Sequence, residues 1–524
     1  MAKKEFKEEY YDSELNLSGK ATNKSSQTKM IKKRAKPKNI VFMYMGATNL
    51  GIEYLSSYLK ASGHRTSLVF DPALFNDKYW LEIPFLHKIF KKKDEEIISE
   101  VINFVPDFVC FSVLTDNYLW ACNLAKKIKK RINVPIVFGG IHSTSVPDVV
   151  INNDFVDYVI VGEGEESLLK LADDFQLKDI PNLVYKKDNQ IIKNPLAPPM
   201  DINKLPFPDK ELFGEHIKSS HYNIITSRGC PFGCTYCSAN YVNKLYNKKF
   251  VRRRSVENVM DELRQAKRNK KINKINFDDD VFTMNIEWFK EFMNLYKKEI
   301  NLPFRCLTHP IYLTDEVGLI IKNSPCYKIE IGIQCMDENI RKKLLKRYET
   351  NEQIIKALNV CKKYKLPFHI DHMFGFTKQG DKLLKKTARL WNEYRPKRIT
   401  CYWLQYFPKT EIIDLMNVSK KEVEQLERGV TSMYFVSGSV KGKKKKRMFK
   451  SYVVLFRSLQ LMPKFFVTFL LNTNLYKFLA YIPDILITPI DLFVAIKAKD
   501  FKVFNYVAYY LHQFAKMQKK RVLL

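Results

Sequence analysis

Three cysteines stand close together in the stretch SRGCPFGCTYCSAN, residues 227–240: Cys230, Cys234 and Cys237. Thiolates hold iron–sulfur clusters, and three thiolates on a cubane of four irons leave one iron open to a small chelating molecule. The glycines and the proline of the loop let its backbone curl around such a group. A zinc site would want a fourth Cys or His close by, and none follows in the loop. Zinc and chance clustering are the alternatives.

The composition indicates a folded and strongly basic protein. Its 524 residues are 46% hydrophobic, enough for real cores, and carry a formal net charge of +32. The Met-Ala-Lys-Lys opening lacks the apolar run of a secretory signal, and the ten cysteines do not resemble a disulfide framework, so we expect a cytoplasmic protein. The charge would attract anionic surfaces, although a biased genome composition is an equal explanation of the lysines.

The amino-terminal half has the pattern of a parallel sheet. Residues 1–38 show no sustained apolar period and are expected to form a disordered basic tail. Over residues 39–200, short apolar runs alternate with helical segments, which indicates an α/β, doubly wound, Rossmann-like domain. The expected strands are residues 39–45, 66–71, 107–114, 135–140 and 157–162.

A second series of strands and helices follows a Pro-bounded linker at 205–213, and residues 201–430 are expected to form a six-unit (β/α) partial TIM barrel. The first expected strand, residues 222–230, is closed by Cys230. Thr350 and Gln353 form a capping box at the start of one helix. The other expected strands are residues 274–280, 303–310, 327–335, 367–376 and 398–407.

The segment CPFGCTYC resembles the CxxxCxΦC motif of the radical S-adenosylmethionine (SAM) enzymes, with Tyr236 in the aromatic slot. The resemblance implies a [4Fe–4S] cluster held by Cys230, Cys234 and Cys237. It also implies that SAM binds the open iron and is cleaved reductively to a 5′-deoxyadenosyl radical. An electron donor such as flavodoxin or ferredoxin is a further implication.

Other stretches of the same half are similar to this family in part. In NFDDDVFT, Asp278 and Asp279 would face the SAM ammonium group; alternatively Asp279 and Asp280 cap the following helix. In IGIQCMD, Gln334 replaces the usual Glu and can still hydrogen-bond a ribose.

Four further positions have two readings each. Cys335 either touches substrate or cofactor or is a small buried apolar residue. Three histidines either point into the barrel or are core or solvent histidines: His309, His369 and His372. From the usual Gly-Leu-Pro-Gly-Glu-Thr turn, Gly375 and Thr377 remain, and Gly375 is expected to lie at the cofactor site.

The amino-terminal domain resembles a cobalamin-binding domain. Ser112 and Leu114 match its Ser-x-Leu element, and Gly139 and Gly140 match its Gly-Gly element. The usual Asp-x-His-x-x-Gly loop is absent, because the corresponding MGATNLG has no Asp or His. The resemblance therefore implies cobalamin bound without a histidine on cobalt at the carboxyl ends of these strands, or a sheet that has lost the cofactor.

The last region, residues 431–524, has a Lys-rich stretch at 443–447 followed by Phe-, Tyr- and Leu-rich helical segments. Pro483, Asp484, Pro489 and Asp491 interrupt its most apolar part, which argues against a membrane span. The region is expected to form a helical cap over the barrel mouth; resting on an acidic membrane at the inner face is the alternative. An apolar cap near the active site indicates a hydrophobic substrate such as a lipid or tetrapyrrole.

Together these features predict a radical SAM enzyme that methylates an unactivated carbon with the help of cobalamin. Oxidative cyclisation, as in the anaerobic magnesium-protoporphyrin ester cyclase, is the alternative in the same family. Methylthiolation of tRNA is disfavoured, because only Cys110 and Cys122 are available for the second cluster of such enzymes. A non-catalytic, metal-stabilised binder of nucleic acid or membrane is the alternative from another class, and nucleic acid is the less favoured partner.

Overall fold

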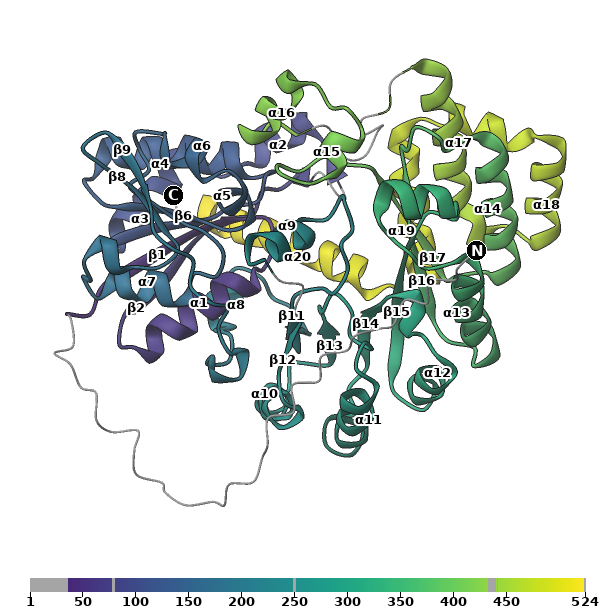
Figure 1. The fold of residues 1–524 in the computed structure, drawn as a ribbon, viewed down its shortest axis with the longest axis horizontal. Coiled ribbons are helices and arrows are strands. Elements are labelled where there is room, and N and C mark those ends of the chain that lie inside the picture. Colours follow the sequence, from purple (N-terminus) through teal and green to yellow (C-terminus); the bar gives the residue numbers. More distant parts are fainter. Residues whose placement is uncertain (1–35, 78–80, 248–250, 432–439, 441, 523–524) are drawn as a thin grey trace, which may run out of the picture. The chain divides into compact units, whose positions relative to one another are not determined.

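The computed structural model describes residues 36–77, 81–247, 251–431, 440 and 442–522. Its first domain is built on a seven-stranded sheet in the order β2-β1-β5-β6-β7-β8-β9 (Figure 1). The five parallel strands confirm those predicted: β1 (Asn39–Met45), β2 (Arg65–Asp71), β5 (Phe108–Ser112), β6 (Ile136–Gly139) and β7 (Tyr158–Ile160). An antiparallel hairpin of β8 (Leu183–Lys187) and β9 (Gln190–Lys193) extends one edge.

Helices cover both faces of this sheet, as the alternation of side chains along β1 shows. Val41 and Met43 enter a core with α3 and α4, whereas Ile40 and Phe42 enter a second core with α1 and α7. Burial on both faces is typical of a parallel sheet. The short β3 (Asn76–Asp77) and β4 (Leu81–Glu82) pair outside it; the helices are α1 (Leu50–Ala61), α2 (Pro84–Phe90), α3 (Asp94–Asn103), α4 (Tyr118–Arg131), α5 (Ile141–Ser145), α6 (Pro147–Ile151), α7 (Glu165–Ala172) and α8 (Glu211–Gly214).

The second domain has the predicted six parallel strands, in the order β10-β13-β14-β15-β16-β17. They are β10 (His221–Ile224), β13 (Lys274–Phe277), β14 (Phe304–Thr308), β15 (Cys326–Gln334), β16 (Phe368–Phe374) and β17 (Arg398–Trp403). Each strand is hydrogen-bonded to the next in chain order, and the pairing makes an open, partial barrel. The helices are α9 (Ser238–Leu245), α10 (Val256–Arg268), α11 (Ile286–Leu295), α12 (Asp315–Lys322), α13 (Asn351–Lys363), α14 (Asp381–Tyr394), α15 (Ile412–Leu415) and α16 (Lys420–Glu427).

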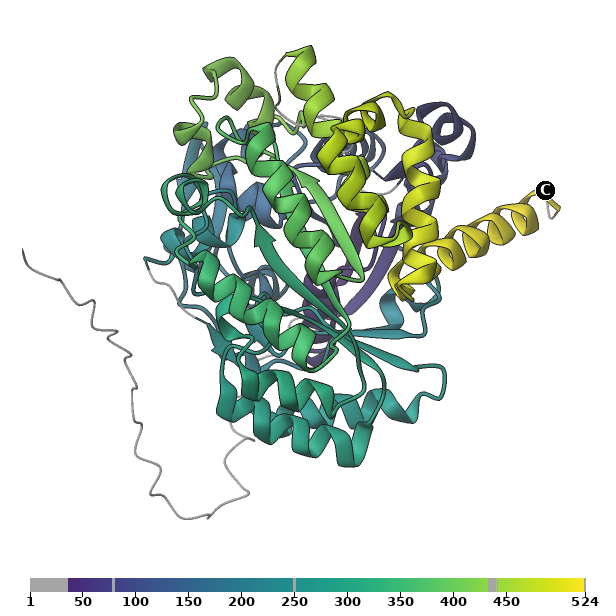
Figure 2. The same cartoon turned by 90° about the vertical axis from the view of Figure 1, so that its right-hand side faces the viewer.

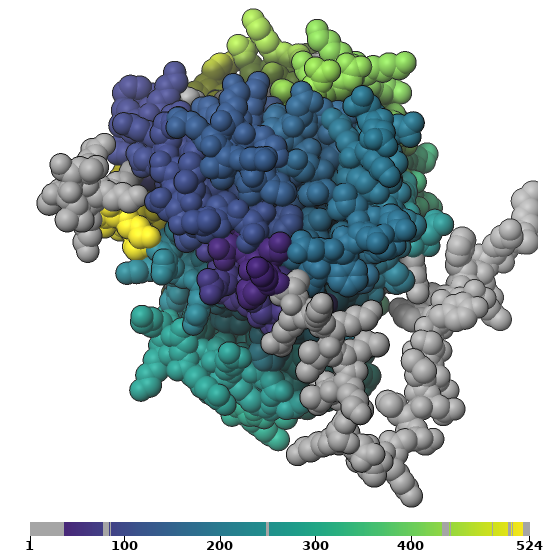
Figure 3. Space-filling view, turned by 90° about the vertical axis from the view of Figure 1, so that its left-hand side faces the viewer, coloured from purple at the N-terminus to yellow at the C-terminus, as the bar shows by residue number. Residues whose placement is uncertain are grey.

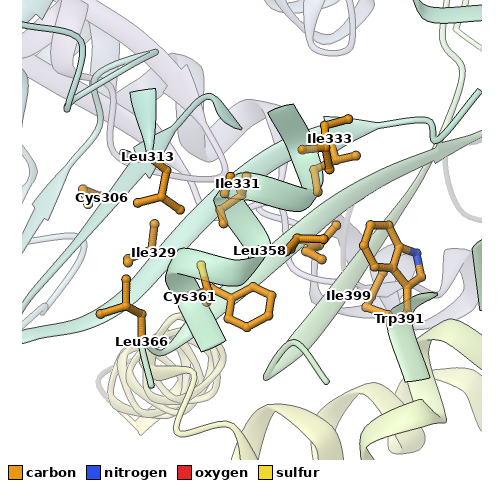
Figure 4. Close-up of a cluster of buried hydrophobic side chains, with 14 of the residues drawn as sticks. Cys306, Leu313, Ile329, Ile331, Ile333, Leu358, Cys361, Leu366, Trp391 and Ile399 are labelled. Carbon is orange, nitrogen blue, oxygen red and sulfur yellow. The ribbon is translucent and has the colours of Figure 1, made fainter. Parts of the chain in front are cut away.

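The core of this domain lies between the strands and their helices. Ile329, Ile331 and Ile333 of β15 are fully buried and pack with Leu358 of α13 and Trp391 of α14 (Figure 4). Because successive side chains of a strand point to opposite faces, Lys328 and Glu330, on either side of Ile329, face the interior of the barrel. The Thr350/Gln353 capping box at the start of α13 is confirmed.

The first barrel strand differs from the prediction. β10 ends at Ile224, and the chain then forms a separate two-residue strand, β11 (Ser227–Arg228), antiparallel to β12 (Arg252–Arg253). Cys230 therefore follows β11 and does not close the barrel strand itself. Ser227 and Arg228 pair with β12, and the backbone N–H of Thr226 donates to Asp279. These partners lie far away in the sequence, so the apolar run YNII could not predict where the barrel strand ends.

The carboxyl-terminal region consists of α17 (Lys443–Ser458), α18 (Lys464–Thr473), the 3-10 segment η7 (Leu475–Tyr481), α19 (Asp484–Lys497) and α20 (Phe501–Val522). It packs along the outside of the barrel, beside α14 and β17, and does not form the expected cap over the mouth (Figure 2). Lys445 bonds to the carbonyl of Thr377, past the carboxyl end of β16, whereas Asp500 binds Arg398 at the amino end of β17. The region lies along the side of the barrel because the buried face of α17, with Phe449, Tyr452 and Phe456, packs into the barrel core.

The last helix returns to the amino-terminal domain. Tyr509 donates to the carbonyl of Pro72, and the Tyr510 hydroxyl accepts from the backbone of Phe75. In Figure 3 the yellow surface of this helix accordingly borders the purple and blue surface of the first domain. The described residues from Pro37 onward form one compact unit. The predicted domain boundaries stay predictions, and the predicted tail lies outside the described residues except for 36–38.

Among the described residues, no single helix has the length and apolar composition to cross a membrane. Leu475–Tyr481 and Leu486–Lys497 meet that criterion only as a pair, by length and composition alone, with a bend of 116° between them.

Candidate functional site

The three cysteines lie in a loop that neighbouring elements hold from several sides. Cys237 is the N-cap residue of α9, and its backbone N–H donates to the carbonyl of Cys234. Asn243 of α9 donates to the carbonyl of Cys230 at 2.9 Å. Thr235 bonds through its N–H and its hydroxyl to Leu345 and Leu344. The spacing of the motif thus folds into a loop braced against α9 and the segment after β15.

The thiols are close enough to influence one another. Burial raises the pKa of Cys230 to about 12 and that of Cys237 to about 11, and the charges of the neighbouring cysteines add to both shifts. A buried loop of this kind stabilises thiolates only with a cationic partner, as iron would be. In the described part of the chain no three Cys, His, Asp or Glu side chains converge on one metal ion, whereas a cubane spreads its ligands over separate irons.

Asp279 anchors the start of this loop. Its carboxylate accepts from the backbone N–H of Thr226 at 3.1 and 3.0 Å, from the Thr226 hydroxyl at 2.7 Å and from the Ser227 hydroxyl. Asp278 instead forms an ion pair with Arg305 of β14. Neither Asp279 nor Asp280 caps the next helix, because α11 is capped by Asn285, whose side chain accepts from Trp288.

The carboxylate of Asp280 acts on two of the three thiols. Its negative charge contributes to the raised pKa of both Cys230 and Cys237. Burial, with the charge of Asp279, raises the pKa of Asp280 to about 6. The contact of Asp278 or Asp279 with the SAM ammonium group stays a prediction. Asp280, which was expected only as a helix cap, is a further candidate for that contact.

Replacing Asp279 with Ala is expected to cost about 2–4 kcal/mol of folding free energy, because it leaves buried donors of Thr226 and Ser227 without an acceptor. The released loop should also bind less iron after anaerobic reconstitution. Chemical denaturation and an iron assay measure the two effects. Asp261→Ala, on the exposed face of α10, is the control and should change stability by less than about 0.5 kcal/mol. Equal stability of both variants would contradict the anchoring role.

A buried network supports the loop from the side of β15. Arg347 donates to the carbonyl of Gly332 at 2.6 Å, to Glu349 at 2.7 Å and to the Tyr236 hydroxyl at 3.4 Å. Glu349 also contacts the His309 ring at 3.5 Å, and that ring stacks on Phe232 of the loop at 4.1 Å. The cation of Arg347 opposes the effect of burial on the Cys234 thiol pKa. The sequence did not indicate this network.

Two other predicted site residues of the barrel, Gln334 and Gly375, lie at the ends of neighbouring strands. Gln334 ends β15 with a backbone φ of 65°, which is unusual for a residue with a side chain and is typical of functional sites. Gly375 has a φ of 110° directly after β16, where a side chain would meet Leu404 and Val440. Both follow the carboxyl ends of their strands, the edge where the site is expected.

Three residues with open readings are structural. Cys335 is buried among apolar side chains that include Met373 and Leu404. His372 packs against Phe374 and Phe456 in the outer core. His369 lies near Asp500, at 3.9 Å, at the amino end of its strand.

A cavity of about 250 Å³ lies at the carboxyl ends of the strands in the first domain. Ser112, Gly139 and Gly140 line it, whereas the half-exposed Leu114 does not. Gly140 has a φ of 89°, and a side chain there would approach the backbone of Val113 to 2.7 Å, so the wall at this point requires glycine. Among the described residues that line the cavity there is no histidine.

The same cavity reaches the start of the cysteine loop. Arg228 and Ile225 line it from the second domain, opposite Glu163 and Glu165 of the first. Arg228 contacts Glu163 at 3.2 Å and Glu165 at 2.8 Å, and Arg252 binds Glu163 at 2.5 Å. These contacts tie β11 and β12 to the first domain, and Arg228 is separated from Cys230 by one residue. The cavity therefore borders the strand that leads into the cysteine loop.

Two family models match the chain in the order that the fold shows. The model of the radical SAM superfamily matches residues 224–390, and that of the B12 binding domain matches residues 44–172. The chain is a radical SAM enzyme with an amino-terminal B12-binding domain. The two families bring with them the cofactors predicted from the sequence: a [4Fe–4S] cluster and SAM for the first, and cobalamin for the second. Chemistry of the first kind requires an electron donor.

Relatives match the enzyme over more than half of its length. An uncharacterized methyltransferase of Pyrococcus horikoshii is 27% identical over 351 residues, which cover 65% of the enzyme and 72% of the relative. The anaerobic magnesium-protoporphyrin IX monomethyl ester cyclase of Rubrivivax gelatinosus is 22% identical over 68% of the enzyme and 64% of the cyclase. The radical SAM methyltransferase TsrM of Kitasatospora setae, solved with cobalamin and a [4Fe–4S] cluster, shares the fold with a TM-score of 0.57 at 14% identity, over 72% of the enzyme and 77% of TsrM.

Proposed function

We propose that the enzyme transfers a methyl group from SAM to an unactivated carbon in a cobalamin-dependent reaction. When bound, the cluster supplies an electron that breaks SAM, and cobalamin supplies the methyl group. Each turnover would consume two SAM molecules and two electrons. One SAM yields 5′-deoxyadenosine and methionine, the other yields S-adenosylhomocysteine, and the substrate exchanges a hydrogen for a methyl group.

The proposal assigns the residues as follows. Cys230, Cys234 and Cys237 hold the cluster. Tyr236 lies beside it, and its hydroxyl accepts a hydrogen bond from Arg347. SAM contacts come from the aspartates after β13 and from Gln334 and Gly375, at the carboxyl ends of the barrel strands. Ser112, Gly139 and Gly140 line the cobalamin site. In this proposal these three groups of residues bind and orient the cofactors.

One observation carries the proposal: the cavity of the B12-binding domain is bordered by Arg228, next to the cysteine loop. Methyl transfer requires both cofactors to act on one substrate, and the shared border brings their sites together. The names of relatives support methyl transfer in the first place and cyclisation in the second. The expectation of a hydrophobic substrate rested on an apolar cap over the barrel mouth, and the carboxyl-terminal helices lie outside the barrel, so this argument no longer applies. Flavodoxin or ferredoxin stays the proposed electron donor.

The products of SAM distinguish methyl transfer from cyclisation. Enzyme reconstituted anaerobically with iron, sulfide and cobalamin is mixed with SAM and a reductant, and nucleosides are separated by chromatography. We expect both 5′-deoxyadenosine and S-adenosylhomocysteine, the latter only in samples that hold cobalamin. Formation of 5′-deoxyadenosine alone, with cobalamin retained, would favour the cyclase alternative.

The variant Gly139→Val tests the cobalamin site. A valine side chain would enter the cavity, and an added Cβ has room, since its nearest contact is the Ile160 carbonyl at 4.0 Å. We expect cobalamin affinity to fall about tenfold or more through steric overlap, with cluster content unchanged. The absorbance of corrinoid retained after gel filtration measures the effect. Gly214→Val, at an exposed position outside the cavity where an added side chain meets nothing within 4 Å, is the control; equal retention by both variants would refute the assignment.

A further inference from the structure

The outward faces of α18, η7 and α19 are unusually apolar for an exposed surface. Phe465 and Phe478 are 76% and 67% exposed, and Phe493 is 61% exposed. In α18 the opposite face, with Val467, Leu470 and Leu471, is buried, so its exposed aromatics are not a side effect of loose packing. We call the exposed side chains of these three segments the aromatic patch: Phe465, Phe469, Phe478, Tyr481, Leu486 and Phe493.

The charge around the aromatic patch is predominantly positive. Residues 443–499 contain eleven Lys and Arg against two Asp. Both aspartates are engaged within the protein: Asp484 with Lys450 at 2.8 Å and Asp491 with Arg457 at 2.8 Å. Arg447, from the Lys-rich start of α17, lies over the Tyr481 ring at 5.7 Å, which places basic side chains directly beside the patch.

We infer that the aromatic patch docks on the surface of an anionic lipid bilayer. Exposed aromatic side chains with flanking lysines are what a helix lying in the membrane interface presents: the rings enter the headgroup region and the cations meet lipid phosphates. Charge complementarity favours this occupant over a second copy of the chain, because two copies would bring like charges together. The inference is independent of the proposed reaction.

Vesicle sedimentation tests the inference with the full-length enzyme. Sucrose-loaded vesicles of phosphatidylcholine alone are compared with an equal-part mixture of phosphatidylcholine and phosphatidylglycerol. We expect binding to the anionic vesicles, weakened at high salt, and a loss of about tenfold or more in the triple variant Phe465→Ser, Phe469→Ser, Phe478→Ser. All three positions are exposed, so the fold should persist, and circular dichroism checks it.

The matched control removes as many exposed apolar side chains elsewhere: Leu119→Ser, Leu319→Ser and Tyr348→Ser. It should bind the anionic vesicles as the unmodified enzyme does. Equal binding by the patch variant and the control would overturn the inference. So would a dimer in gel filtration that only the patch variant abolishes, since the patch would then be an interface between copies. Binding that resists high salt and is released only by detergent would also overturn it, by indicating insertion.

Discussion

Replacing any one of Cys230, Cys234 and Cys237 with Ala is expected to abolish SAM cleavage. The three thiols belong to one loop, and a cubane held by three thiolates loses a required ligand when any one of them is removed. The rate of 5′-deoxyadenosine formation should fall by about three orders of magnitude or more, as when a member of a catalytic unit is removed. Iron content and the absorbance of the cluster after anaerobic reconstitution should fall with it.

Cys122→Ala is the matched control, because Cys122 lies on α4 of the other domain and does not take part in the loop. It should keep the iron content and the rate of the unmodified enzyme. A loop variant that retains full iron and cleaves SAM would disprove the ligand assignment. Loss of iron from Cys122→Ala as well would point to a general effect of cysteine removal and not to ligation.

Replacing Asp500 with Ala is expected to destabilise the enzyme by about 3 kcal/mol, at the low end of the cost of breaking a buried ion pair. Asp500 is 2% exposed and binds Arg398 at 2.8 Å and Lys328 at 3.2 Å. Without it, each of the two buried cations loses an ionic partner, while Arg398 keeps its contact with Asp491 and Lys328 its contact with Glu330. Chemical denaturation followed by tryptophan fluorescence measures the loss, and limited proteolysis should cleave α20 sooner.

The pH dependence of this difference has a defined sign. Burial alone would raise the pKa of Asp500, but the charges of Lys328 and Arg398 outweigh burial and lower it below its usual value. The contribution is therefore fully present above the pKa of an unfolded aspartate, about 4, and disappears as the pH falls through the lower folded value. Asp484→Ala, which removes a surface ion pair, should cost less than about 1 kcal/mol. Equal losses in the two variants would contradict the role of Asp500.

The sequence by itself determined the features that depend on local patterns. The spacing of Cys230, Cys234 and Cys237 predicted the family, and the alternation of apolar runs predicted all eleven parallel strands of the two sheets. The Thr350/Gln353 capping box was readable because both partners lie within one helical turn. Gly139 and Gly140 were predicted because they match the Gly-Gly element of a cobalamin-binding domain at the end of a strand, and both line the cavity.

Only the tertiary structure decided which side chains meet across long stretches of chain. Glu163 binds Arg228 from 65 residues away, and Asp500 reaches Lys328 from 172 residues away. Such pairs leave no periodic trace in the sequence, because each partner alone resembles any surface charge. The same reason explains why the bonds of Asp279 to Thr226 could not be predicted, and why the position of the carboxyl-terminal helices against α14 and β17, and not over the mouth of the barrel, was not expected.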